Sequence, residues 1–159
     1  MLAVLHNCLE PRFMPPDSWL DLGESTPFAA VIFDCDGTLV ESAPAHLRAM
    51  QAAAEAQKQE MSDAWYHARK GLDRRALFEA FSAEMSAPFD VNRACEESIT
   101  LYADFTQLVR PVPEEAAFAR NLKARGVPIA LATNGERKVA ALSLSAAGHS
   151  SVFQTQVCI

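Results

Sequence analysis

The chain has 159 residues, half of them hydrophobic, and a formal net charge of −6. This length suits one domain, or one domain with a modest insert. The acidic balance argues against nucleic acid or an anionic membrane as the main partner, because both bind a basic face. No apolar run approaches the roughly 20 residues of a membrane span. The oligomeric state is left open.

The cysteines are scattered, so the chain contains no C-x-x-C metal or redox signature. We interpret them as reduced thiols of a cytoplasmic protein, most of them buried. They are Cys8, Cys35, Cys95 and Cys158.

Residues 1–27 show no clean period, and the stretch "PRFMPPDSW" carries three prolines. Proline interrupts helices, so we predict an irregular N-terminal extension. An alternative is a partner-binding segment that uses Phe13, Met14 and Trp19.

Residues 28–33 are continuously apolar, which predicts a strand buried on both faces. Ser42 is expected to cap the helix that follows, and Pro44 suits its first turn.

The middle of the chain, residues 43–109, is rich in helix-forming residues and contains no convincing strand pattern. Ser62 and Asp90 stand at expected helix N-caps. We predict a helical insert.

The remaining residues alternate between helix and strand patterns. An amphipathic helix over 114–126 places Phe118 and Leu122 on its inner face. An apolar strand over 127–135, a helix over 136–148 and a third strand over 151–159 follow. With the insert set aside, the order predicts an α/β fold with parallel strands and crossover helices.

Polar residues stand where two of these strands end. Asp34 and Asp36 follow the first strand, and Thr133 and Asn134 follow the second. Ligands bind beyond the carboxyl ends of parallel strands. Paired carboxylates there suit Mg²⁺; alternatively, one attacks a substrate while the other moves protons. Gly37 permits a sharp turn close to a ligand.

The Asp-x-Asp-Gly run also occurs in calcium loops and in ordinary turns. A calcium loop does not fit, because Thr38 and Ala45 occupy positions that need oxygen-rich ligands. An ordinary turn remains open, since Asp and Gly are common in turns.

The stretch "FDCDGTLVES", residues 33–42, resembles the first motif of the haloacid dehalogenase superfamily. The stretch "IALATNG", residues 129–135, is similar to the family's second motif. The helical insert resembles the cap of the phosphoglycolate-phosphatase and β-phosphoglucomutase branch. The resemblance extends over residues 28–157.

The resemblance implies a Rossmann-like parallel sheet, with the core in residues 28–42 and 110–159. The α-helical cap would then comprise residues 43–109. It also implies a phosphatase acting on a small phosphorylated metabolite, such as a sugar phosphate or phosphoglycolate. A phosphomutase is the alternative enzyme.

The resemblance also implies roles for individual residues. Asp34 would be the nucleophile that forms an aspartyl-phosphate, and Asp36 would protonate the leaving oxygen and then activate water. The Asp34 carboxylate and the Asp36 backbone carbonyl would hold Mg²⁺. Thr133 and Asn134 would bind the phosphoryl group.

The chain departs from the family pattern after Lys138, where no lysine, arginine, aspartate or glutamate follows. The family's later lysine and acidic pair therefore have no counterpart. We expect a truncated core, and a catalytically incomplete domain is a further alternative. The strand over 28–33 would then have an unpaired apolar edge, which favours aggregation.

A basic loop surrounds Gly71 in the insert. Arg69 and Lys70 are candidate contacts for an anionic substrate, and a solvated basic turn is the alternative. Cys35 is expected to pack sideways without reacting.

Overall fold

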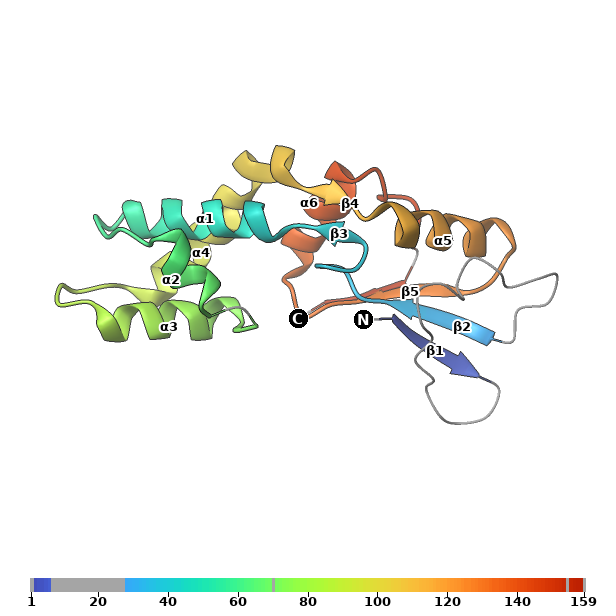
Figure 1. Ribbon diagram of the computed structural model, residues 1–159, viewed down its shortest axis with the longest axis horizontal. Helices are drawn as coiled ribbons and strands as arrows, with labels where there is room; N and C mark the ends of the chain where they lie inside the picture. The colour runs from blue at the N-terminus through green and yellow to red at the C-terminus, as the bar shows by residue number, and fades with distance from the viewer. Residues whose placement is uncertain (1, 7–27, 70, 154, 159) are drawn as a thin grey trace. The chain divides into compact units, whose positions relative to one another are not determined.

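The computed structural model describes residues 2–6, 28–69, 71–153 and 155–158 (Figure 1). The chain divides into two compact units. Ser42–Val109 is one unit, here called the cap; the segments Met1–Glu41 and Arg110–Ile159 make up the other, here called the core. The sequence predicted the insert at 43–109. In the described parts of the chain, no helix is long and apolar enough to cross a membrane.

A sheet with the strand order β1-β2-β5-β6 forms the centre of the core. The strands β2, β5 and β6 are parallel, and β1 is antiparallel to β2. The predicted α/β fold with a parallel, Rossmann-like sheet is confirmed. The strands are β1 (Leu2–His6), β2 (Phe28–Phe33), β5 (Ile129–Ala132) and β6 (Thr155–Val157).

The strand β1 corrects two expectations. Residues 2–6 are not irregular: Leu2 pairs with Phe33, and His6 pairs with Phe28. We had expected one edge of β2 to be unpaired, but β1 is hydrogen-bonded to it. The added strand satisfies backbone amides and carbonyls that an open edge would expose. Residues 7–27, including the alternative partner-binding residues, lie outside the described part of the chain.

Two helices connect the parallel strands. The helix α5 (Pro113–Ala124) precedes β5, and α6 (Arg137–Ala146) joins β5 to β6. Both connections step in the same direction across the sheet, so right-handed crossovers place both helices on one face. Figure 1 shows them on the same side of the sheet.

The core packs under these helices. Phe33 is fully buried, and its ring centroid lies 6.0 Å from that of Phe118 and 5.5 Å from that of Phe153. Phe118 and Leu122 are both buried, as predicted for the inner face of α5. Gly126, with φ of 73°, follows the helix in the left-handed conformation that often ends helices.

The prediction that β2 is buried on both faces is wrong. Val31 and Phe33 on one face are buried, whereas Ala30 and Ile32, which point to the other face, are only half-buried. The two crossover helices cover one face only. A continuous apolar run therefore did not distinguish a strand covered on one face from a strand covered on two.

A two-stranded ribbon was not predicted. β3 (Val40–Glu41) pairs antiparallel with β4 (Arg110–Pro111), so Val40 lies opposite Pro111. The ribbon brings together the two core segments that flank the cap in sequence.

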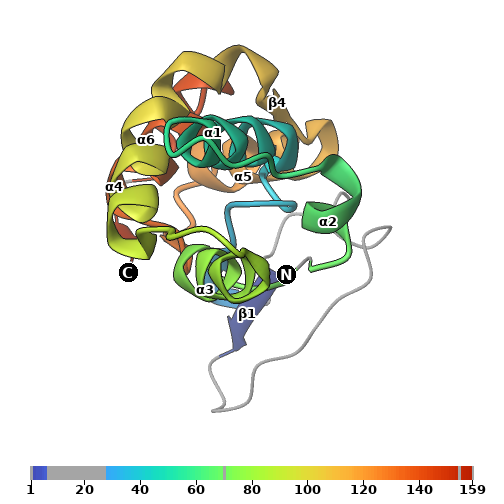
Figure 2. The same cartoon turned by 90° about the vertical axis from the view of Figure 1, so that its left-hand side faces the viewer.

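The cap is helical, and its described residues contain no strand. Its core gathers Met50, Leu77, Phe78 and Phe81, with Trp65 packed against it. The elements are α1 (Ala43–Glu55), α2 (Asp63–His67), α3 (Arg74–Glu84), α4 (Val91–Leu101) and the 3₁₀ helix η2 (Tyr102–Leu108). Figure 2 shows α1 and α3 nearly end-on.

Two of the three predicted N-caps form the expected hydrogen bond. The Ser62 side chain accepts from the amide of Trp65, and the Asp90 side chain accepts from the amide of Arg93. Ser42 holds the N-cap position of α1, but its backbone is already helical and its side chain makes no capping bond. A capping hydroxyl normally requires extended backbone at that residue, which explains the difference.

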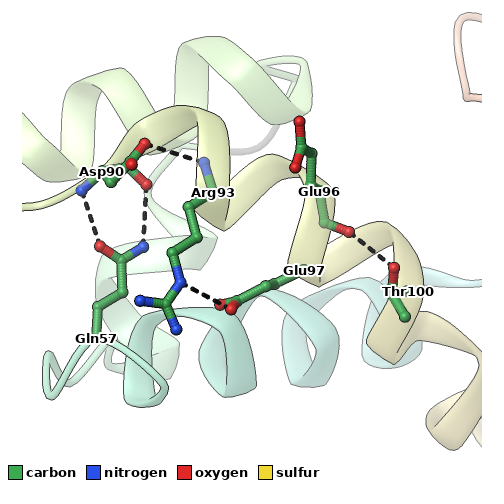
Figure 3. Close-up of polar contacts among 6 residues, drawn as sticks. All are labelled: Gln57, Asp90, Arg93, Glu96, Glu97 and Thr100. Carbon is green, nitrogen blue, oxygen red and sulfur yellow. Dashed lines mark hydrogen bonds and ion pairs between the residues drawn. The ribbon is translucent and has the colours of Figure 1, made fainter.

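A side-chain amide fastens the end of α1 to the start of α4 (Figure 3). Gln57 Nε2 donates to the Asp90 carbonyl at 3.0 Å, and the Asp90 amide donates to Gln57 Oε1 at 2.8 Å. Arg93 Nε pairs with Glu97 Oε1 at 2.8 Å one turn later. The capping residue of α4 is thus held by a residue far away in sequence.

His149 is a buried titratable group in the core. It is 2% exposed, and its Nε2 has no hydrogen-bond partner among the described residues. Burial, followed by the nearby positive charge of Arg120, lowers the pKa of His149 below its ordinary value of 6.5.

The folded protein therefore disfavours protonated His149, whereas the unfolded chain accepts the proton more readily. We expect its contribution to stability to be complete above about pH 6.5 and to decline as the pH falls below that value. Urea unfolding measures the free energy of unfolding at pH 7.5 and at pH 5.5. The decrease from pH 7.5 to pH 5.5 should be smaller in His149→Leu than in the wild type. Equal losses in the two proteins would contradict the assignment.

Candidate active site

A tight turn follows β2 and shapes the first part of the site. The amides of Thr38, Leu39 and Val40 all donate to the Cys35 carbonyl, at 3.3, 2.9 and 3.1 Å. The Gly37 amide donates to the Val40 carbonyl at 2.7 Å. Gly37 has φ of 75°, a conformation that glycine adopts without strain, so this position explains the glycine of the motif.

The turn folds Thr38 back onto the first aspartate. Thr38 Oγ1 donates to Asp34 Oδ2 at 3.2 Å, and the Thr38 side chain is buried. Asp34 and Asp36 are both half-buried. The sequence pattern does not indicate this contact, because it depends on the geometry of the turn that brings Thr38 to Asp34.

The second part of the site follows β5. The Thr133 amide donates to the Val157 carbonyl at 3.0 Å, and Thr133 Oγ1 accepts from the Gly135 amide at 3.0 Å. Thr133 is 8% exposed and therefore almost fully enclosed. Because the hydroxyl oxygen accepts from Gly135, its hydrogen is available to donate elsewhere.

Gly135 shows how near the two parts lie. A Cβ at this glycine would be 3.3 Å from Thr133 Oγ1 and 3.5 Å from Asp36 Oδ2. The Asp36 carboxylate and the Thr133 hydroxyl therefore flank one small space, which a larger residue at Gly135 would occupy. Sequence reasoning did not single out Gly135.

The strand register accounts for this meeting. β2 and β5 are parallel, with Phe33 beside Leu131, so the residues after each strand emerge at the same edge. The structure thus brings Asp34, Asp36 and Thr133 to one end of the sheet. Asn134 follows Thr133 and is exposed.

Cys35, between the aspartates, is fully buried. Burial raises the pKa of its thiol, and the negative charges of Asp36 and Asp34 raise it further. The side chain is therefore a neutral thiol near neutral pH, and thiols are poor nucleophiles in that state. Its burial agrees with the expected packing role.

The donors at this site are hard oxygen atoms, which is the chemistry that Mg²⁺ prefers. Within the described residues, no group of three or more His, Cys, Asp or Glu side chains is placed to hold a metal. Mg²⁺ is commonly held by one or two carboxylates together with waters and substrate phosphate. The Asp34–Asp36 pair fits that smaller protein contribution.

The described basic side chains around Gly71, which include the candidate substrate contact Arg69, interact with other residues of the cap. The guanidinium of Arg69 lies 4.0 Å from the centroid of the Trp65 ring and forms an ion pair with Glu84. Arg74 donates to Ser98, and its neighbour Arg75 to Asn92. These arginines bond within the cap itself. Lys70 lies outside the described residues.

Comparisons with known proteins agree with the fold and the motifs. The family model of haloacid dehalogenase-like hydrolases matches residues 28–159. A hydrolase from Pseudomonas syringae has a TM-score of 0.65 at 21% identity; the match covers 80% of this chain and 59% of that one.

Three further solved structures carry ligands. CbbY from Rhodobacter sphaeroides, in complex with phosphate, has a TM-score of 0.70 at 17% identity, covering 80% of this chain and 61% of that one. A mutant of CbbY was solved with xylulose-(1,5)bisphosphate. YfnB from Bacillus subtilis, bound to magnesium, has a TM-score of 0.62 at 15% identity, covering 80% and 63%.

At these identities the solved structures establish a common fold. The chain spans about three fifths of the length of these structures. The family model, by contrast, extends over most of the sequence. The chain therefore belongs to the haloacid dehalogenase-like hydrolase family.

Proposed function

We propose that this protein is a Mg²⁺-dependent phosphatase that acts on a small phosphorylated metabolite. The observation that carries the proposal is the meeting of Asp34, Asp36 and Thr133 at the carboxyl ends of β2 and β5. Family membership and the phosphate bound to CbbY support it. A sugar phosphate or phosphoglycolate is the expected substrate class.

In the proposed reaction, an Asp34 carboxylate oxygen forms a bond to phosphorus. The bond between phosphorus and the leaving oxygen breaks, and that oxygen takes both the electron pair and a proton from Asp36. Water then attacks the phosphorus of the aspartyl-phosphate and gives its proton to Asp36. The bond to Asp34 breaks, which restores the carboxylate and releases inorganic phosphate.

The other residues position and neutralise the phosphoryl group. The Thr133 hydroxyl, whose oxygen accepts from Gly135, donates its hydrogen to a phosphoryl oxygen, and the backbone at Asn134 completes the cradle. The Asp34 carboxylate and the Asp36 carbonyl would hold Mg²⁺, which supplies charge neutralisation when bound.

We place the protein in the cytoplasm. The described cysteines, Cys35, Cys95 and Cys158, are all free thiols. Free thiols are typical of a reducing compartment.

Hydrolysis of p-nitrophenyl phosphate with Mg²⁺ tests the proposal. Asp34→Asn should lose at least about a thousandfold in rate, because the nucleophile is removed. Asp104→Asn, which changes a carboxylate on the exposed side of η2 in the cap, is the matched control and should keep the wild-type rate. Equal rates in wild type and Asp34→Asn would reject the enzyme and favour the catalytically incomplete domain.

A further inference from the structure

We propose that Thr38 is a positioning residue that fixes the orientation of the Asp34 carboxylate. The proposal rests on the function proposed above, since it assigns Thr38 a task in preparing the nucleophile. Its basis is the hydrogen bond from Thr38 Oγ1 to Asp34 Oδ2, 3.2 Å long, between side chains four residues apart.

The turn does not need this hydroxyl. Its backbone amides, from Gly37 to Val40, already donate to main-chain carbonyls. The Val112 amide donates to the Leu39 carbonyl at 3.0 Å and ties the turn to the segment before α5. The Thr38 hydroxyl donates instead to the Asp34 carboxylate.

An aspartate carboxylate needs such a restraint to attack in one defined geometry. Rotation about its last side-chain bond is soft, with broad, roughly two-fold preferences. A donor fixed to one oxygen makes the two oxygens inequivalent and limits that rotation. Thr38 is 8% exposed, so surrounding atoms hold the donor in place. Positioning a reacting group within a fraction of an ångström strongly affects rate.

Two substitutions separate the hydroxyl from the shape of the side chain. Thr38→Val keeps the branched shape but removes the donor, whereas Thr38→Ser keeps the donor. We expect Thr38→Val to lower kcat by about ten- to a hundredfold with little change in KM, and Thr38→Ser to recover most of the rate. A change confined to KM, or equal losses in both variants, would overturn the proposal.

Crystal structures of both variants test the positioning without turnover. In Thr38→Val the Asp34 carboxylate should rotate or occupy two orientations, and in Thr38→Ser it should keep the wild-type orientation. A single unchanged orientation in Thr38→Val would overturn the proposal, whatever the activity. Failure of the proposed function is seen separately, as equal rates in wild type and Asp34→Asn.

Discussion

Asp36→Asn is expected to slow hydrolysis of an alkyl phosphate by about a hundred- to ten-thousandfold, because the leaving alkoxide loses its proton donor. The carboxamide of asparagine keeps the shape of the side chain, but it cannot act as a general acid that transfers a proton to the leaving oxygen. With p-nitrophenyl phosphate the first step should suffer much less, since p-nitrophenolate leaves without protonation. The second step should remain slow, because water loses its base.

The two substrates should therefore give different time courses. Rapid mixing of Asp36→Asn with p-nitrophenyl phosphate should release up to one equivalent of p-nitrophenol in a burst, followed by slow turnover. Glu114→Gln is the control, because Glu114 is an exposed carboxylate in the first turn of α5, outside both motifs. This substitution should leave the rates of hydrolysis of both substrates unchanged. Equal losses on both substrates with no burst would contradict the two-step role of Asp36.

Where a signal is local, the sequence predicted the structure well. Ser62 and Asp90 cap their helices through bonds to residues three positions ahead, which the pattern contains. The position of the polar residues at the strand ends was also predicted, because parallel strands place their carboxyl ends at one edge. Asp34, Asp36 and Thr133 meet there for that reason.

The features that sequence reasoning missed depend on contacts between distant segments or on exact turn geometry. β1 pairs with β2 across about twenty intervening residues, and no local pattern marks that partner. The β3–β4 ribbon joins residues on either side of the cap. Thr38 reaches Asp34 only because the turn closes around the Cys35 carbonyl.

Ile32 and Phe33 illustrate the same limit on a smaller scale. Both belong to one apolar run, yet Phe33 is fully buried and Ile32 is half-buried. The apolar composition identifies the strand. Whether one or both of its faces are covered depends on whether the crossover helices lie on one side of the sheet or on both. Burial of individual strand residues therefore requires the topology.

This difference leads to the largest stability effect that we expect. Phe33→Ala should destabilise the core by about 3–5 kcal/mol, because it removes a buried ring between Phe118 and Phe153 and leaves a cavity. Phe33 also directly precedes Asp34, so loosening its packing should disturb the end of β2 where the proposed nucleophile lies.

Ile32→Ala, one residue earlier on the less covered face, is the matched comparison and should cost clearly less, because Ile32 is already partly exposed to water. Urea unfolding at pH 7.5 measures both changes, and keeps His149 neutral in both proteins. Similar losses for the two variants would mean that both faces of β2 are buried, as the apolar run alone had suggested. A small loss for Phe33→Ala would show that the cluster with Phe118 and Phe153 does not carry the stability of the sheet.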